Sequence, residues 1–299
     1  EAGLEIIDIE EPQLRPGSVK LRVEHGSVCG TDLHIYNWDP WAANRIHPPR
    51  VVGHEFCGTV VEVAPDVQTH RVGDYVASES HIVCNECKQC LHGQGHVCTR
   101  TRILGVDVDG GFGRFAVVPA QNARQVPASV PRSVASMLDA LGNGVHTAMA
   151  GPVEGRSILI TGMGPIGLFA VAVCKALGAA QVVATEVSPF RIGLAEKLGV
   201  DTCLNPRTDD VDSALGRLQP DGFDATLEMS GHPTALPLAI RHTRPGGRIS
   251  MLGVYPDRLQ DVDVNMAIFK GLDLQGIVGR RLWDTWDQMN WLLTEKHLD

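Results

Sequence analysis

Four cysteines within fifteen residues form the most compact set of chemically active side chains in the sequence. The stretch CNECKQCLHGQGHVC contains Cys84, Cys87, Cys90 and Cys98. Four thiolates at this spacing can surround one zinc ion tetrahedrally and leave no open coordination position, which is typical of a structural site. An iron–sulfur cluster is the competing interpretation, since cysteines also hold such clusters. His92 and His96 lie in the same loop and are interpreted as solvated loop residues.

A second set of metal-binding residue types is spread more widely. Cys29 lies in SVCGTDLH, and His54 and Glu55 lie in VVGHEF. A thiol, an imidazole and a carboxylate from separate loops can hold a zinc ion with one position open for water or substrate. Thr31 and His34 follow Cys29 by two and five residues. A hydroxyl at the metal could therefore pass its proton to Thr31 and then to His34 at the surface.

Each member of this second set also has an ordinary structural interpretation. Cys29 could be a small buried side chain, His54 a core histidine and Glu55 a surface acid. Only the combination predicts a catalytic metal centre.

The hexapeptide GMGPIG at residues 162–167 matches G-x-G-x-x-G. It follows the apolar run SILIT and precedes the helix-like IGLFAVAVCKALG. Gly162, Gly164 and Gly167 allow a tight turn and close approach of a pyrophosphate at a helix N-terminus. A glycine turn that serves only helix packing is the alternative.

An acidic residue at the end of the next predicted strand favours the dinucleotide interpretation. Glu186 follows Gly167 by nineteen residues. Its carboxylate can accept hydrogen bonds from ribose hydroxyls and would repel a 2′-phosphate, which favours NAD over NADP. Arg191 could offset that repulsion, or it could be a surface helix residue that covers the adenine.

The hydrophobic pattern predicts an α/β protein with two domains that meet near residue 140. In the first domain, short strands with Gly and Pro punctuation indicate a barrel-like fold, and they are expected at 19–23, 58–63, 73–77 and 115–120. Residues 133–151 predict helix. From residue 156 onward, helices alternate with apolar strands, which indicates a parallel sheet and places its strands at 157–164, 181–188, 201–206, 223–231 and 248–254.

Length and charge narrow the possible functions. The 299 residues, 43% of them hydrophobic, suffice for one large or two medium domains. A net charge of -9 offers no basic field for a nucleic acid. The longest apolar run, at 158–174, is interrupted by Gly and Pro, so we expect no membrane span.

The two ends of the chain bear on its location and on its completeness. The first residues lack the pattern of a signal peptide, which favours a reducing cytoplasm, where clustered thiols bind metal more often than they pair. The chain opens without Met and stops within a helix-like stretch, so we expect a fragment.

The GHE motif, the four-cysteine stretch and GMGPIG, in that order, resemble the zinc-dependent medium-chain alcohol dehydrogenases over essentially the whole chain. CGTDLHIYNWDPWA, LGVDVDGGFGRFAVVPA and GRRLWDTW are most similar to members that oxidise the C3 hydroxyl of L-threonine with NAD to 2-amino-3-oxobutanoate. The resemblance implies a GroES-like catalytic domain at 1–140 with a zinc lobe at 84–98, a Rossmann domain at 141–278, and a truncated C-terminal return to the catalytic domain at 279–299. It also implies a cytoplasmic homotetramer.

The same resemblance assigns roles to individual residues. It implies two zinc ions per subunit, a catalytic one on Cys29, His54 and Glu55 and a structural one on the four clustered cysteines. It gives Thr31 and His34 the proton relay, and it gives Asp139 a supporting role near the catalytic zinc. The implied NAD contacts outside the glycine pattern are Ile166, Glu186, Arg191, Leu252, Gly253, Val254, Ile277 and Val278.

Two other functions compete with threonine oxidation. A related zinc dehydrogenase acting on polyols or 2,3-butanediol would share metal and cofactor and differ in the pocket. A non-enzymatic zinc-binding module would bind neither NAD nor a second zinc ion.

Overall fold

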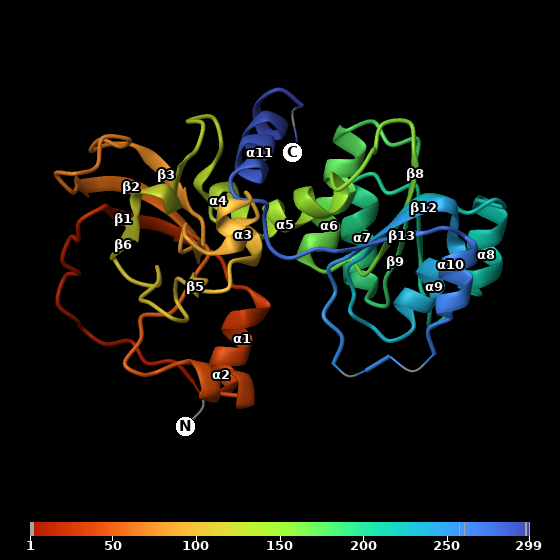
Figure 1. Ribbon diagram of the computed structural model, residues 1–299, viewed down its shortest axis with the longest axis horizontal. Coiled ribbons are helices and arrows are strands. Elements are labelled where there is room, and N and C mark those ends of the chain that lie inside the picture. The colour runs from red at the N-terminus through yellow and green to blue at the C-terminus, as the bar shows by residue number, and fades with distance from the viewer. Residues whose placement is uncertain (1–2, 257, 260, 297, 299) are drawn as a thin grey trace. The chain divides into compact units, whose positions relative to one another are not determined.

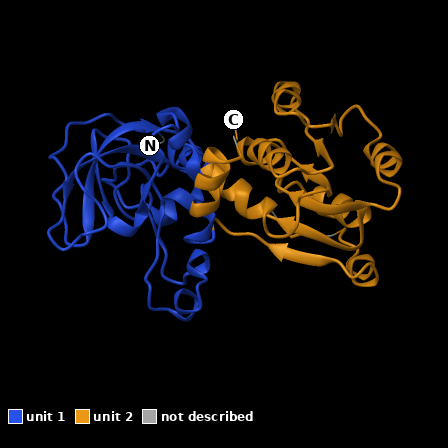
Figure 2. Cartoon of the chain, turned by 90° about the horizontal axis from the view of Figure 1, so that it is seen from above, with its two compact units in different colours: residues 1–139, 281–286 blue, residues 140–280, 287–299 orange. Residues whose placement is uncertain are grey.

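The computed structural model describes residues 3–256, 258–259, 261–296 and 298. They form two compact units, coloured separately in Figure 2. Unit 1 contains residues up to 139 together with 281–286, and unit 2 contains 140–280 together with the rest of the chain. The sequence predicts boundaries after residues 140 and 278, whereas the units change at 139/140, 280/281 and 286/287.

Unit 1 is built on an antiparallel five-stranded sheet with the order β6-β1-β2-β3-β7. Figure 1 labels β1, β2, β3 and β6 of this sheet. Its strands are β1 (Ser18–Gly26), β2 (Phe56–Val63), β3 (Tyr75–Ser78), β6 (Phe115–Pro119) and β7 (Ala123–Gln125). The inward side chains of these strands form one core, in which Leu21, Phe56 and Val60 are almost fully buried. The four strands expected in this part of the chain are confirmed, and β7 was not expected.

Short helices and a small lobe complete unit 1. The helices, including 3-10 turns, are α1 (Gly30–Asn37), α2 (Pro40–Arg45), α3 (Lys88–Leu91), η1 (Gly95–Val97), η2 (Ala120–Asn122) and α4 (Arg132–Ala135). Strands β4 (His81–Ile82) and β5 (Arg102–Ile103) pair at the base of the cysteine lobe. Asp39 caps α2 through the amide of Ala42, and Pro40 opens the helix.

Unit 2 is built on a parallel six-stranded sheet with the order β10-β9-β8-β11-β12-β13. Its strands are β8 (Ser157–Thr161), β9 (Gln181–Thr185), β10 (Thr202–Leu204), β11 (Phe223–Glu228), β12 (Thr243–Met251) and β13 (Asp273–Gly276). Numbered within the unit, this is the order 3-2-1-4-5-6 of a Rossmann fold, which binds dinucleotides where the order reverses. The reversal lies between β8 and β11, and every residue of β8 is buried.

Helices connect the parallel strands of unit 2. They are α6 (Pro165–Ala176), α7 (Pro189–Lys197), α8 (Val211–Leu218), α9 (Ala235–His242) and α10 (Val264–Phe269). Two further helices, α5 (Leu138–Ala148) and α11 (Asp284–Thr294), include positions where the chain passes from unit 1 to unit 2. Among the residues described, none of the helices combines the length and the apolar character needed to cross a membrane.

The predicted α/β fold is therefore confirmed, with two local differences. Residues 133–151 form two helices, α4 and α5, which are interrupted near Ser136. The edge strand β13 was not predicted, because three of its four residues are exposed and the pattern has little apolar signal.

Candidate active site and metal centres

The four clustered cysteines converge within the lobe between β4 and β5. Neighbouring Sγ atoms lie 3.9 Å apart for Cys84–Cys90 and 3.5 Å for Cys87–Cys90. Two further separations are 3.8 Å for Cys87–Cys98 and 3.5 Å for Cys98–Cys84. A tetrahedron with zinc–sulfur bonds of about 2.3 Å has edges of about 3.8 Å, so these sulfurs fit one zinc ion. All four thiols are free of disulfide bonds.

Backbone amides support negative charge on these sulfurs. The amide of Cys87 donates to Sγ of Cys84 at 3.3 Å, and the amide of Arg100 donates to Sγ of Cys98 at 3.3 Å. Backbone hydrogen bonds from Cys90 and Thr99 lower the pKa of Cys87. These hydrogen bonds favour the thiolate of Cys87, the form that zinc binds, whereas burial raises the pKa of Cys90 to about 12.

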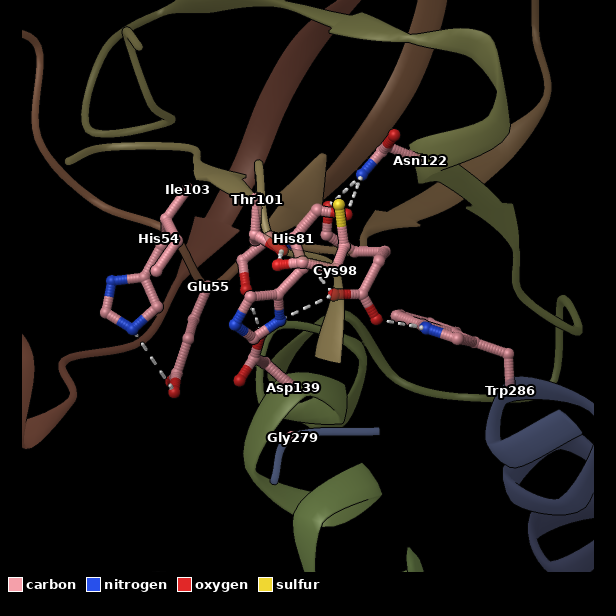
Figure 3. A network of polar contacts seen from close by, with 12 residues as sticks. His54, Glu55, His81, Cys98, Thr101, Ile103, Asn122, Asp139, Gly279 and Trp286 are labelled. Atoms are coloured by element: carbon pink, nitrogen blue, oxygen red, sulfur yellow. Dashed lines mark hydrogen bonds and ion pairs between the residues drawn. The ribbon is translucent and has the colours of Figure 1, made fainter. Parts of the chain in front are cut away.

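The second predicted set also comes together, in unit 1. Cys29 is the N-cap of α1, while His54 and Glu55 immediately precede β2. One ligand atom from each lies within 4.8 Å of the others, and Figure 3 shows His54 beside Glu55. His54 and Glu55 are 5% and 4% exposed. A partly buried thiol with a buried imidazole and a buried carboxylate close to it suits a zinc ion with an open position.

Electrostatics around this set favour a bound cation. Burial raises the pKa of Glu55, and the charge of Asp139 adds to that rise. Burial alone would lower the pKa of His54, but hydrogen bonds to Asp32 and Cys29 raise it to about 11. Several acidic side chains therefore lie close together in a buried region. A divalent cation would compensate their negative charge.

Two residues that sequence reasoning missed hold these side chains in place. The carboxylate of Asp32 accepts from the Cys29 amide at 2.8 Å, and its Oδ1 lies 3.5 Å from Nδ1 of His54. The hydroxyl of Ser27 contacts the Glu55 carboxylate. Such partners orient metal ligands. The position of Asp32 in the first turn after Cys29 is a sequence signal for its role, whereas nothing in the spacing indicates Ser27.

The proposed relay residues lie on α1 next to Cys29. The hydroxyl of Thr31 is 3.9 Å from Sγ of Cys29. His34 is one helical turn further on, and its side chain is 61% exposed. Its Nδ1 lies 2.5 Å from a carboxylate oxygen of Asp39. The helix therefore leads from the metal-binding residues to solvent, as a proton relay requires.

Asp139 lies beside the metal-binding set through a network in unit 1 (Figure 3). Its carboxylate accepts from the Ser80 hydroxyl at 2.6 Å. The neighbouring Glu79 is fully buried and accepts from the indole nitrogen of Trp286 at 2.7 Å and from the amide of His81 at 2.9 Å. The network holds the segment between β3 and β4 that carries Ser80, and no residue spacing along the chain indicates it.

In unit 2 the glycine hexapeptide forms the turn between β8 and α6. Gly162 has φ +86°, which favours glycine, and a Cβ on Gly167 would lie 2.0 Å from the Gly162 carbonyl oxygen. A Cβ on Gly164 would meet no atom within 4 Å. Gly162 and Gly167 are thus required by the turn and by helix packing, while the space at Gly164 suits an approaching pyrophosphate. Ile166 follows in the first turn of α6.

Glu186 follows β9 and is tied to the glycine turn. Its carboxylate accepts from the amides of Met163, Val187 and Ser188 at 2.8, 2.9 and 2.8 Å. Arg191 is half exposed, and its guanidinium lies 3.8 Å from Glu186. The negative charge is therefore fixed beside the pyrophosphate turn, and the arginine lies next to it on α7.

The remaining predicted coenzyme residues follow β12 and β13. Leu252, Gly253 and Val254 come directly after β12, and Val254 is 90% exposed. After β13, Ile277 is buried and Val278 is half exposed. Both segments lie at carboxyl ends of parallel strands, which is where dinucleotides bind.

Comparison with known proteins finds a matching family model for each of the two units. A family model for the alcohol dehydrogenase GroES-like domain matches residues 15–128, and one for zinc-binding dehydrogenase matches residues 165–295. L-threonine 3-dehydrogenase from Pyrococcus abyssi is 47% identical over 298 residues, 99% of this chain and 86% of the relative. The chain belongs to the zinc-dependent alcohol dehydrogenases.

Solved structures of other dehydrogenases are similar to this alcohol dehydrogenase over almost its whole length. Galactitol-1-phosphate dehydrogenase from Escherichia coli superposes with a TM-score of 0.92 at 25% identity, covering 100% of this chain and 88% of the other. An Escherichia coli alcohol dehydrogenase complexed with NADH gives 0.90 at 29% identity, covering 99% and 86%. This dehydrogenase is thus an oxidoreductase of a family whose members use zinc and a nicotinamide dinucleotide.

Proposed function

We propose that this dehydrogenase oxidises the C3 hydroxyl of L-threonine to 2-amino-3-oxobutanoate and transfers the hydride to NAD. The observation that carries the proposal is that ligand atoms of Cys29, His54 and Glu55 lie within 4.8 Å of one another, with His54 and Glu55 buried. The choice of threonine rests on the 47% identity to a threonine dehydrogenase over 99% of the chain.

We assign two zinc ions to each subunit. The four cysteines of the lobe would hold one closed site, and Cys29, His54 and Glu55 would hold the other. When bound at the second site, zinc supplies Lewis acidity to the substrate hydroxyl. Asp32 orients His54, and Ser27 orients Glu55.

The chain itself moves the proton. Thr31 accepts the proton of the substrate hydroxyl and passes it toward His34, which delivers it to solvent. Asp139 supports the site through its charge rather than by direct ligation. The turn GMGPIG would hold the dinucleotide and Glu186 would accept hydrogen bonds from its adenosine ribose, which favours NAD over NADP. When bound there, NAD would supply the hydride acceptor.

A related dehydrogenase of polyols or vicinal diols is the second candidate. It is favoured by the similarity to galactitol-1-phosphate dehydrogenase. The first candidate has the higher sequence identity, 47% against 25%.

One substrate panel separates these functions. NADH formation is followed at saturating NAD with L-threonine, sorbitol and 2,3-butanediol, using protein loaded with zinc. We expect kcat/KM for L-threonine to exceed the others by about a hundredfold, because a site built to hydrogen-bond polar substrate groups rejects analogues that lack them. Preference for a polyol or diol would establish the second candidate, and absence of NADH binding would point to a zinc-binding module without enzyme activity.

We also propose a cytoplasmic homotetramer. Support comes from β13, whose outer edge has no strand partner among the described residues. Ile268 and Phe269 near this edge are 65% and 89% exposed. Exposed apolar side chains beside an open strand edge are typical of contact surfaces. Light scattering on the purified chain measures the assembly directly.

A further inference from the structure

Glu228 ends β11 at the point where the strand order of unit 2 reverses. Its carboxylate is fully buried, although no role followed from the sequence. A buried carboxylate is costly unless hydrogen bonds compensate it. Its contacts therefore indicate what the residue does.

One oxygen of this carboxylate gathers four donors. Oε1 accepts from the amide and hydroxyl of Ser230 at 2.9 and 2.7 Å and from the amide of Gly231 at 3.0 Å. It also lies 3.3 Å from the hydroxyl of Thr161, the last residue of β8. A single atom thus joins the segment after β11 to the strand that leads into the glycine turn.

The segment after β12 packs on the same residue. The backbone carbonyl of Glu228 accepts from the amides of Leu252 and Gly253 at 2.9 and 3.1 Å. A Cβ on Gly253 would lie 2.5 Å from Oε2 of Glu228, and a Cβ on Gly231 would lie 2.3 Å from the Val254 carbonyl oxygen. Only glycine fits at both positions. The segments that follow β11 and β12 therefore pack directly against each other beside the carboxylate.

The glycine turn completes the arrangement. A Cβ on Gly162 would lie 2.8 Å from Cα of Ser230, and the amide of Met229 donates to the Thr161 carbonyl at 3.0 Å. The segments that follow β8, β11 and β12 therefore meet at one buried side chain. Small shifts of Glu228 would move all three.

The second oxygen of the carboxylate faces Tyr255. Oε2 of Glu228 and the Tyr255 hydroxyl are both buried, and neither has a hydrogen-bond partner among the described residues. Burial and the charge of Glu228 raise the pKa of Tyr255, which keeps its hydroxyl protonated beside the carboxylate.

We propose that Glu228 is a positioning residue that sets the binding surface for the nicotinamide half of the coenzyme, an inference that rests on the proposed function. In a Rossmann fold each half of the sheet binds one mononucleotide. Glu186, on the β8–β10 half, accepts hydrogen bonds from the amides of Met163, Val187 and Ser188. The adenosine half therefore has its own anchor.

The test compares NADH with AMP as ligands of the 299-residue chain. Glu228→Ala is expected to weaken NADH binding by about tenfold or more, while AMP binding changes by less than about twofold. Glu228→Gln is expected to stay within about threefold of wild type, because the amide oxygen accepts the same four hydrogen bonds and the side chain keeps its size. Glu154→Ala, an exposed carboxylate in the same unit, is the matched control.

The fluorescence of bound NADH gives each dissociation constant and also reports the surroundings of the ring. Equal weakening of NADH and AMP, or unchanged NADH binding in Glu228→Ala, would overturn the inference. If Glu228→Ala does not fold, Glu228→Asp replaces it, since the shorter arm keeps the charge and cannot reach all four donors. A wild-type chain that binds no NADH would overturn the proposed function itself, whereas normal wild-type binding with insensitive variants would overturn only the role of Glu228.

Discussion

At the scale of single residues, chemical function depends on neighbours more than on residue type. Cys57 and Cys29 are both thiols, yet burial raises the pKa of Cys57 to about 11. Its sulfur lies 3.3 Å from the backbone carbonyl oxygen of Arg132. Cys29 lies beside an imidazole and a carboxylate instead. The same side chain is thus fully buried in one place and is a proposed metal ligand in the other.

Thr31 gives a direct test of the relay. Thr31→Ala should retain zinc and NADH binding and lose about a hundredfold or more in kcat, because the positioned proton acceptor is removed. Stopped-flow NADH formation together with metal analysis measures both properties. Thr208→Ala, at an exposed site in unit 2, is the control and should match wild type. Wild-type turnover in Thr31→Ala would rule out the relay.

At the scale of elements, the metal lobe is formed by one short segment of the chain, whereas the sheets are formed by contacts between strands that are distant in sequence. The lobe has no extensive core of its own, and its helices α3 and η1 are one turn or less. Isolated turns of this length are unstable in water. A metal that joins four side chains is therefore the expected source of order in this segment.

Replacing one cysteine of the lobe tests that expectation. Cys87→Ser should bind one zinc ion fewer per chain and lower the melting temperature by several degrees, because a structural zinc contributes folding free energy. Metal analysis and calorimetry measure the two effects. Cys203→Ser, which changes a thiol in β10, should keep the full zinc content. An unchanged melting temperature after loss of zinc would contradict a structural role.

Asp224 illustrates how one carboxylate joins strands of unit 2. It accepts from the amide and hydroxyl of Ser157 at 3.0 and 3.1 Å and from the guanidinium of Arg244 at 2.8 Å. Burial would raise the pKa of Asp224, but these hydrogen bonds hold it below the ordinary value of 3.8. The folded protein thus prefers the charged form.

This preference makes a pH-dependent contribution to stability. Because the folded pKa is the lower one, the contribution is complete above the unfolded pKa of about 3.9 and is lost as pH falls through the folded value. Asp224→Asn should therefore destabilise the protein at pH 7 by about 1 kcal/mol, a figure that allows for solvent screening, and the difference should shrink toward pH 3. Urea unfolding at both pH values measures it, with exposed Asp221→Asn as the control. A difference independent of pH would exclude the charge as its source.

At the scale of the whole molecule, the proposed zinc binding and the proposed coenzyme binding belong to separate units. The zinc ligands and Asp139 belong to unit 1, and the glycine turn and Glu186 belong to unit 2. Each unit has its own sheet and its own core.

Removal of zinc should therefore separate binding from turnover. Chelation is expected to abolish threonine oxidation and to leave NADH affinity within about threefold, because unit 2 provides the coenzyme contacts. NADH fluorescence titration before and after chelation measures this, and restored turnover on adding zinc controls for damage. Loss of NADH binding in the metal-free protein would show that the two tasks depend on one another.

The sequence by itself determined the features whose signal is local. Metal-ligand spacing predicted the lobe, since all four cysteines lie in one loop. The glycine hexapeptide and Glu186 predicted the coenzyme turn, because a turn between a strand and a helix is a short-range structure. Alternating strands and helices predicted the parallel sheet, whereas β13 escaped because an edge strand buries too few side chains to leave a pattern.

Only the tertiary structure decided which distant residues meet. Asp32 and His54 are far apart in sequence yet lie 3.5 Å apart. Glu228 and Thr161 meet because parallel strands β8 and β11 are neighbours, with Glu228 in register opposite Thr161. A hydrogen bond acts over about 3 Å in space and leaves no periodic trace along the chain. The sequence pattern therefore does not predict the residues that orient ligands or align loops. Only the folded chain places them beside the sites that the motifs predict.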